Sequence, residues 1–202
     1  MSERQDIEAR VLSLWEEDRD SAFELLVQHF AKPLYHFIRH IVHTHEDADD
    51  VLQETFLKLW KGLDNFRKES ALSTFIYRIA YNEAISFLRK QRRKFKILHP
   101  FSNFEDWYIQ RIQADPYIDY DSAYKKILQE IALLPPRQKA VFSLRHFDGL
   151  PFKEIAVRLD ISESTARTTY HQVVNKLKSK ISGLNIHEQI ASKTTEPTKV
   201  ER

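Results

Sequence analysis

Residues 151–177 hold two stretches of helical periodicity separated by a short polar turn, and no other feature constrains the fold of this chain as strongly. Apolar side chains recur at helical spacing in each stretch: Phe152, Ile155, Ala156 and Leu159 in the first, and Ala166, Tyr170, Val173, Val174 and Leu177 in the second. Each predicted helix therefore has one face to bury. Ser162 is in position to cap the second helix, because its hydroxyl can accept a hydrogen bond from a free amide of the first turn. The pattern predicts a helix-turn-helix.

The second helix has a polar face opposite its apolar stripe. This face carries Arg167, Thr168, His171, Gln172 and Asn175. Side chains of these types hydrogen-bond base edges and phosphates when a helix lies in the major groove. An ordinary helical hairpin with a solvated polar face is the alternative, and the spacing favours a DNA-contacting surface.

The composition indicates an all-α protein. Of the 202 residues, 42% are hydrophobic, which supports real cores, and 3 glycines are too few for a turn-rich β protein. The absence of cysteine excludes disulfides, thiolate zinc sites and thiol nucleophiles. Because the sequence shows neither an apolar run of membrane-spanning length nor a signal peptide, we expect a cytoplasmic location.

Charge alternates along the chain, although the formal net charge is only +2. The net charge is −7 over residues 1–64, +7 over 65–96, −4 over 97–124 and +6 over 125–202. Contacts to a polyanion are expected at the two basic blocks. The acidic blocks are expected to avoid a phosphate backbone or to face a basic protein partner.

The same shifts in charge and composition mark the expected domains. Residues 1–96 are predicted to form one helical domain, and residues 97–120, which include Pro100 and Pro116, an irregular acidic linker. A second helical domain is expected over residues 121–182. The polar residues 183–202 are predicted to form a disordered tail.

Two sequence signals predict helix starts in the first domain. Ser21 with Glu24 and Thr44 with Asp47 both have capping-box spacing. The helix after the second start has an apolar stripe of Val51, Leu52, Phe56, Leu59, Trp60 and Leu63. Its other side has an acidic face, made of Asp50, Gln53, Glu54 and Leu57. This acidic face suits a protein partner, and a solvated surface with one exposed leucine is the alternative.

Aromatic and basic side chains alternate over residues 66–96. Phe75, Tyr77, Tyr81 and Phe87 are interleaved with Arg78, Arg89, Lys90, Arg92, Arg93, Lys94 and Lys96. This mixture suits single-stranded or distorted nucleic acid, because rings stack on exposed bases while cations follow the phosphates. Core aromatics beneath a basic surface helix are the alternative, and several of the rings must be core residues because they keep helical spacing.

Together, the two halves resemble the extracytoplasmic-function (ECF) sigma factors of bacterial RNA polymerase, within the sigma-70 family. Residues 47–60 (DADDVLQETFLKLW) resemble the region 2.2 helix of that family, and residues 66–93 resemble its promoter-melting and −10-binding segment. Residues 134–177 resemble its −35-binding region 4. The resemblance implies two helical domains, region 2 and region 4. It also implies a transcription initiation factor that is not an enzyme and that has no cofactor, metal or small-molecule substrate.

The resemblance implies roles for individual residues of region 2. Asp50, Gln53 and Glu54 are expected to bind the β′ clamp helices of core RNA polymerase. Contacts to the −10 element are expected from Phe66, Arg67, Lys68, Ser73, Arg78, Asn82, Arg89, Arg92 and Arg93. The loop at residues 65–73 is expected to capture a flipped base, and cationic contacts to phosphates would offset the cost of unstacking it.

In region 4, the resemblance implies −35 contacts from Ser164, Thr165, Arg167, Thr168, His171 and Gln172. The expected partners are core RNA polymerase through its β′ and β subunits, promoter DNA and a membrane-associated anti-sigma factor. The acidic linker resembles the segment that threads the RNA exit path of the polymerase. Two positions depart from the family pattern, because Phe75 stands where tryptophan is common and Pro151 where a serine cap is common.

Two other functions fit parts of the sequence. A stand-alone dimeric regulator would use the helix-turn-helix, but it leaves the acidic face and the basic aromatic block unexplained. A metal-dependent enzyme is suggested by a histidine group of His36, His40, His43 and His45, beside Glu46 and Asp47. Neither a third ligand nor a general base can be identified for such a site, so a sigma factor is the prediction.

Overall fold

The computed structural model describes residues 3–66, 70–116 and 122–180, and the regular structure in these ranges is helical. In chain order the elements are α1 (Glu3–Glu17), α2 (Arg19–Val42), α3 (His45–Gly62), the 3-10 helix η1 (Leu63–Asn65), α4 (Leu72–Leu98), α5 (Phe104–Ala114), α6 (Ser122–Ala132), α7 (Pro136–His146), α8 (Phe152–Leu159) and α9 (Glu163–Lys180). The expected all-α class is confirmed. None of the helices in these ranges has both the length and the apolar character needed to span a membrane.

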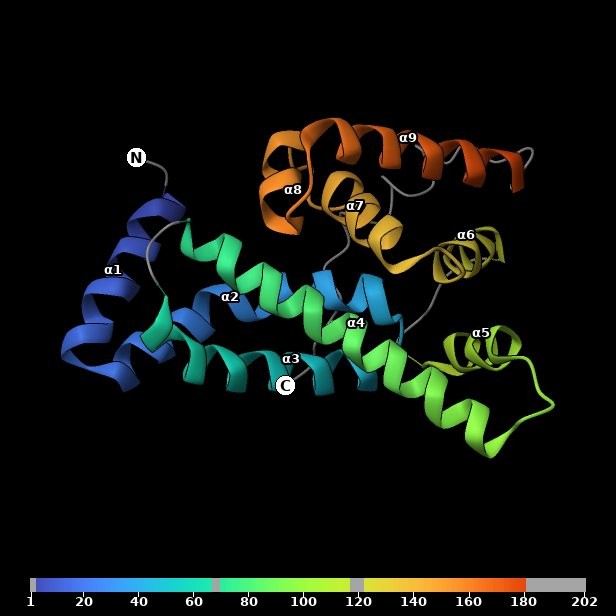
Figure 1. Cartoon of the computed structure of the whole chain (residues 1–202), viewed down its shortest axis with the longest axis horizontal. Coiled ribbons are helices and arrows are strands. Elements are labelled where there is room, and N and C mark those ends of the chain that lie inside the picture. Colours follow the sequence, from blue (N-terminus) through green and yellow to red (C-terminus); the bar gives the residue numbers. More distant parts are fainter. Residues whose placement is uncertain (1–2, 67–69, 117–121, 181–202) are drawn as a thin grey trace.

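Helices α1 to α4 pack into one bundle (Figure 1). Its centre is α2, where Leu26, Phe30, Leu34, Phe37 and Ile41 are fully buried. These residues recur every three or four positions, so they form the apolar stripe of an amphipathic helix. The stripe is covered by α1, α3 and α4, which lie on different sides of α2.

The structure confirms one of the two predicted helix starts and corrects the other. Thr44 caps α3, because its hydroxyl accepts a hydrogen bond from the backbone N–H of Asp47 at 3.4 Å. The prediction for Ser21 is wrong, since α2 begins at Arg19 and Asp18 is its N-cap. The carboxylate of Asp18 accepts from the backbone N–H of Ser21 at 3.2 Å. A further helix, α1, precedes this cap, and no sequence signal predicted it.

The segment predicted to be an irregular linker contains a helix, which is the main correction to the expected architecture. Asn103 caps α5, and its side chain accepts hydrogen bonds from two backbone N–H groups of the first turn. Tyr108 and Ile112 of α5 are buried and cluster with Ala132 of α6. Pro100 and Pro116 lie outside α5, one on each side, so they bound the helix rather than break it.

Helices α6 to α9 form the second unit, with a small core of its own. This core consists of Ile127, Ile131, Leu134, Phe142, Val173 and Leu177. The predicted helix-turn-helix is confirmed in α8 and α9. Asp160 ends α8 in the left-handed backbone conformation, with φ of 55°. Ser162 caps α9, because its hydroxyl accepts from the backbone N–H of Thr165 at 3.1 Å.

The two units pack directly against each other. In Figure 1, α7 lies over α2, and α8 lies over the first half of α4. One cluster of buried side chains runs through both units and includes Phe37 of α2, Tyr77 of α4, Val141 of α7 and Ile155 of α8. We call this packing of α7 and α8 on α2 and α4 the closed arrangement. The tail predicted at residues 183–202 lies outside the described residues.

Candidate functional site

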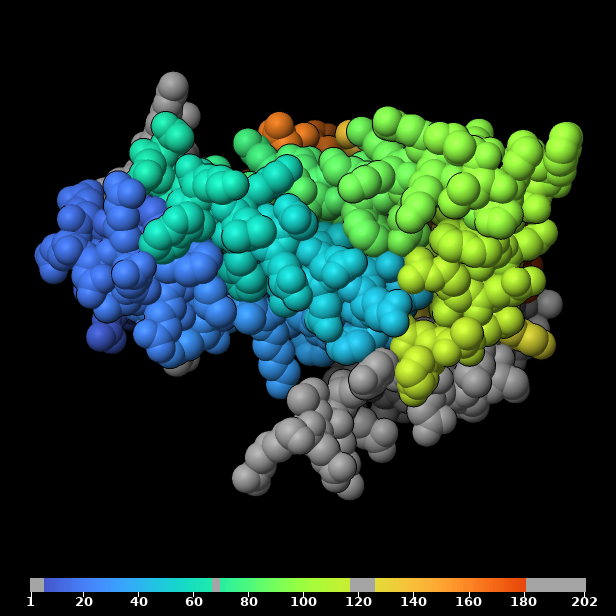
Figure 2. Space-filling view, turned by 90° about the horizontal axis from the view of Figure 1, so that it is seen from below, coloured from blue at the N-terminus to red at the C-terminus, as the bar shows by residue number. Residues whose placement is uncertain are grey.

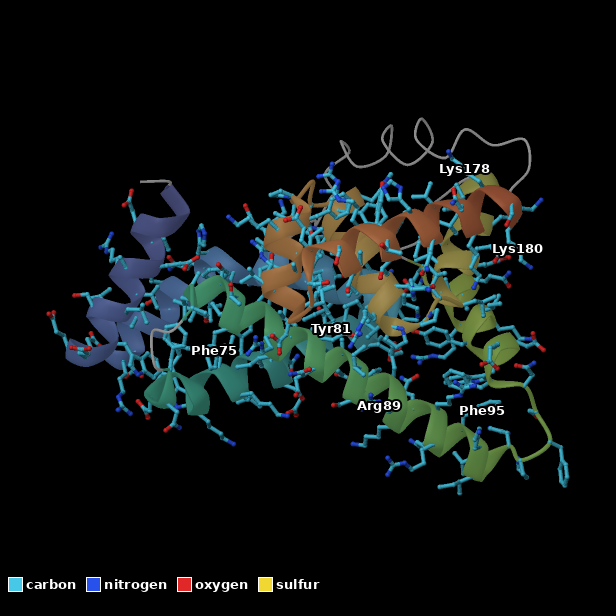
Figure 3. The ribbon with its side chains drawn as sticks, turned by 45° about the horizontal axis from the view of Figure 1, so that its top comes forward. Phe75, Tyr81, Arg89, Phe95, Lys178 and Lys180 are labelled. Atoms are coloured by element: carbon cyan, nitrogen blue, oxygen red, sulfur yellow. The ribbon has the colours of Figure 1, made fainter. Side chains whose placement is uncertain are left out.

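The polar face of α9 is exposed, as the sequence predicted. Arg167, Thr168, His171, Gln172 and Asn175 are all exposed, whereas Ala166, Val173 and Leu177 on the other side are buried. The helix is therefore fixed by one face and presents the other to solvent. Figure 3 shows the basic residues Lys178 and Lys180 at the end of α9.

The first turn of α9 is held by hydroxyl groups. Ser162 contacts the hydroxyl of Ser164 at 2.9 Å and that of Thr165 at 2.7 Å. Ser164 and Thr165 are both exposed. This turn combines exposed hydroxyls with the backbone N–H groups of a helix N-terminus, which is a favourable environment for a phosphate.

Arg167 is oriented by two neighbours. Its guanidinium pairs with Glu163, one turn earlier, at 2.9 Å. Its guanidinium carbon also lies 4.9 Å from the centre of the Phe152 ring, and Arg145 of α7 lies at the same distance from that ring. Attraction between a guanidinium and an aromatic ring limits the directions in which Arg167 can point. The sequence did not reveal Phe152 in this role, because its spacing identified it only as a core residue.

The acidic face of α3 is also exposed. Asp50, Gln53 and Glu54 are accessible, and the Leu57 side chain between them and the helix end is 54% exposed. Figure 2 shows α3 open to solvent on one face of the molecule, between α1 and α5. The structure therefore places these three polar residues and an apolar side chain on one accessible surface.

The predicted −10 residues follow α4 along its length. Figure 3 shows the course of this helix through Phe75, Tyr81, Arg89 and Phe95. Asn82, Arg89 and Arg93 are exposed. Arg78 pairs with Asp160 of the second unit at 3.4 Å, and Arg92 pairs with Glu105 of α5 at 2.9 Å. Two of the predicted cations therefore have carboxylate partners within the chain.

The predicted residues at and just before the start of α4 are less exposed than those further along the helix. Phe66 is partly buried and lies 5.1 Å from Phe75, centre to centre. Ser73 is buried, with 6% of its surface exposed. Tyr77 is buried as well, so among the interleaved rings this one is a core residue and cannot stack on a base in the closed arrangement. Arg67 and Lys68 lie outside the described residues.

A buried ion pair fastens α5 to the first unit, and sequence patterns gave no sign of it. Arg111 of α5 makes two hydrogen bonds to the carboxylate of Asp47, at 3.0 and 3.1 Å. Gln91 of α4 donates to the same carboxylate at 3.0 Å. The sequence spacing of Asp47 indicates a capping-box residue next to the histidine group, not an ion pair. Its side chain is 5% exposed, so its charge is compensated by these partners rather than by water.

The histidine group beside α3 does not converge on a common point. Nδ1 of His40 lies 3.0 Å from the Ser143 hydroxyl, and Nδ1 of His45 lies 2.7 Å from the Tyr35 hydroxyl. In the part of the chain that the structure describes, no group of three or more His, Cys, Asp or Glu side chains is arranged to hold a metal ion. These side chains contact the second unit and α2 instead.

Comparison with protein families matches both units. Residues 26–94 match the family model for sigma-70 region 2, and residues 124–177 match the model for sigma-70 region 4. The chain is 30% identical over 172 residues to RNA polymerase sigma factor YlaC of Bacillus subtilis, an alignment that covers 85% of this chain and 98% of the relative. It is 30% identical over 173 residues to the ECF RNA polymerase sigma-E factor of Escherichia coli, covering 81% and 88% of the two chains.

Solved structures show the same fold at lower identity. The sigma factor RpoE in complex with the anti-sigma factor NepR from Bartonella quintana superposes with a TM-score of 0.61 at 18% identity, covering 80% of this chain and 97% of that one. CnrH in complex with the cytosolic domain of CnrY gives a TM-score of 0.55 at 18% identity, covering 86% and 96%.

A fold of two helical units, one of which contains a helix-turn-helix, is typical of DNA-binding transcription factors. The family models and relatives above belong to this class. The chain belongs to the sigma-70 family of RNA polymerase sigma factors, within its ECF group. Its function is transcription initiation directed to promoters.

Proposed function

We propose that this protein binds core RNA polymerase through the acidic face of α3 and directs it to promoters through α4 and α9. Asp50, Gln53 and Glu54 contact the β′ clamp helices. Region 4 also contacts the β subunit, and the polymerase supplies all catalysis. The protein itself is neither an enzyme nor dependent on a cofactor, and it acts in the cytoplasm.

The DNA contacts divide between the two units. The −10 element is melted and held by α4 and the residues before it, through Phe66, Arg67, Lys68, Ser73, Arg78, Asn82, Arg89, Arg92 and Arg93. The −35 element is bound by Ser164, Thr165, Arg167, Thr168, His171 and Gln172. Residues 1–96 act as region 2 and residues 121–182 as region 4, with α5 in the connection between them.

The observation that carries this proposal is the exposed polar face of α9. The helix buries Ala166, Val173 and Leu177 and leaves a row of base-contacting side chain types accessible on the other side. In a helix-turn-helix, this is the surface that enters the major groove. The chain also has the acidic face of α3 and the cationic side chains of α4. A stand-alone regulator requires neither surface, so their presence favours a sigma factor.

An anti-sigma factor is the proposed regulator. The sigma factor RpoE from Bartonella quintana, which has the same fold, is solved in complex with the anti-sigma factor NepR. In the CnrH structure, the partner is the cytosolic domain of CnrY. A partner with a cytosolic domain supports a regulator whose remaining part lies at the membrane.

The test is co-elution with purified bacterial core RNA polymerase, followed by transcription from fragmented genomic DNA of the source organism. Stable co-elution with new, discrete start sites is the expected result. Binding to duplex DNA without any binding to core polymerase would overturn the proposal in favour of a stand-alone regulator.

A further inference from the structure

Three ionisable side chains lie where region 2 meets region 4, two of them buried and the third, His40, partly buried. His40 and His43 belong to the end of α2, and Lys139 belongs to α7. Lys139 is 3% exposed and His43 is 5% exposed. Ionisable groups are rarely buried without a compensating charge, because a charged form loses its hydration there.

The contacts of these groups are with neutral partners. Lys139 donates a hydrogen bond across the boundary to the backbone carbonyl of Ile41 at 3.4 Å, and its amine lies 5.6 Å from the centre of the Tyr108 ring. The His40 ring stacks on Phe147 of region 4 with 3.9 Å between centres. Its Nδ1 shares a hydrogen bond with the hydroxyl of Ser143. Nε2 of His43 is buried without a hydrogen-bond partner.

The charged neighbours on α2 and α7 oppose further positive charge. On α2, His36 and Arg39 lie beside His40, and on α7 His146 faces it. His43 faces Lys139 of α7 and is also close to Arg39. Asp115 is paired with Arg39, the basic neighbour of both histidines, at 3.0 Å.

Burial and these neighbours change the proton affinities in the same direction. Burial lowers the pKa of Lys139 to about 7. Burial, reinforced by nearby basic groups, also lowers the pKa of His40 and His43 below the ordinary histidine value. Separation of the two domains returns these groups to water, where they bind protons more tightly. Protonation therefore favours separation.

We infer that the contact between α2 and α7 is a proton-sensitive autoinhibitory contact, closed while His40, His43 and Lys139 are neutral and released when they take up protons. The autoinhibitory part rests on the proposed function. The −35 and −10 elements are about 25 base pairs apart, or about 85 Å along the duplex. The 27-residue helix α4 is only about 40 Å long, so two domains packed side by side cannot contact both elements.

The closed arrangement also occupies part of the −10 surface. Arg158 of α8 is buried against Tyr77 of α4, with 4.3 Å between its guanidinium carbon and the ring centre. Arg78, a proposed phosphate contact, is paired with Asp160. Release of region 4 frees both α4 side chains, so opening and promoter binding are coupled.

The test measures the distance between the domains in the full chain, without DNA or polymerase. The chain has no cysteine, so Ser86→Cys on α4 and Lys178→Cys on α9 introduce two exposed dye sites for energy transfer. Transfer is recorded from pH 9.5 to pH 4.5, with helix content followed by circular dichroism. We expect the open-to-closed ratio to rise as pH falls, by up to about tenfold per pH unit for each proton bound on opening.

Two variants separate the contribution of Lys139 to the pH response from that of His40, because the two side chains bind protons in different pH ranges. Lys139→Met fills similar space without a charge, so it should flatten the response above pH 7. His40→Gln should flatten the response below pH 6.5 and leave the upper range unchanged. The matched control is Asp160→Asn, which removes an exposed ion pair across the same boundary. This variant should favour opening equally at every pH from 9.5 to 5.

Either of two results would overturn the inference. The first is constant energy transfer over the whole pH range with helix content retained. The second is an unchanged pH response in both Lys139→Met and His40→Gln. Neither result bears on polymerase or promoter binding, so the sigma-factor proposal is decided separately by co-elution and transcription.

Discussion

Arg158 of α8 and Tyr77 of α4 contact each other across the boundary between the two domains, and both are buried. A buried guanidinium requires compensation, and the ring face together with Glu154 at 3.7 Å provides part of it. Tyr77 was one of the rings that the sequence offered for stacking on bases. In the closed arrangement it stacks instead against a cation from the other domain.

Replacing Asp50, Gln53 and Glu54 together with alanine should weaken binding to core polymerase without unfolding the protein. These side chains are exposed, so their loss changes the surface rather than the core. The dissociation constant for core polymerase, measured by fluorescence anisotropy, should rise at least tenfold. The matched control replaces Asp20, Glu24 and Gln28, an exposed set of the same composition on α2. Equal loss in both triple variants would contradict the assignment of the acidic face.

Arg167→Ala should reduce use of the −35 element selectively. If Arg167 contacts a guanine through two hydrogen bonds, the loss is about 1 to 3 kcal/mol at one base pair. Phe152→Leu should reproduce part of this loss, since the ring orients Arg167. Transcription from promoters mutated at each −35 position measures the effect. Lys178→Ala, at the end of the same helix, should lower all promoters uniformly, and a uniform loss for Arg167→Ala would make Arg167 a phosphate contact.

Arg111→Met should destabilise the protein by about 3 kcal/mol, because it leaves the buried Asp47 carboxylate without its cation. Urea unfolding followed by circular dichroism measures this change. Arg92→Met is the matched control. Arg92 of α4 pairs with Glu105, which lies on α5 like Arg111, but this pair is exposed. It should cost less than about 1 kcal/mol. Similar costs for the two variants would show that burial of Asp47 has no energetic consequence.

Stability should rise with pH above neutrality, and Lys139 should account for much of the rise. Its pKa is about 7 in the folded protein and higher in the unfolded chain, so the unfolded state binds the extra proton between these values. The free energy of unfolding should increase by up to about 1.4 kcal/mol per pH unit in this window. Lys139→Met should remove this slope. Urea unfolding at pH 7, 8, 9 and 10 tests it, and an identical slope in both proteins would refute the assignment.

The sequence predicted the elements whose signals are local. Thr44 and Ser162 cap the predicted helices, and the apolar stripes predicted in α8 and α9 are buried or partly buried. The exposed polar face of α9 followed from the same periodicity. Local signals misplaced the start of α2, because Ser21 and Asp18 both have capping side chains and only the fold decides between them.

Other features depend on contacts distant in sequence and could not be predicted. Residues 104–114 have weak helical periodicity, and α5 is fixed by Tyr108, Ile112 and the ion pair of Arg111 with Asp47. The burial of Lys139 and Arg158 results from packing between the domains. Both residues have the sequence character of surface cations, so hydropathy assigns them to solvent.

The docked helix α5 sets how far apart the two DNA-binding domains can move. Its 11 residues span about 16 Å as a helix but about 36 Å as an extended chain. This stretch is thus shorter as a helix than as an extended chain, and the Arg111–Asp47 pair stabilises the helical form. Any separation of the two units that extends this stretch therefore has to break the Arg111–Asp47 pair, whose carboxylate is buried.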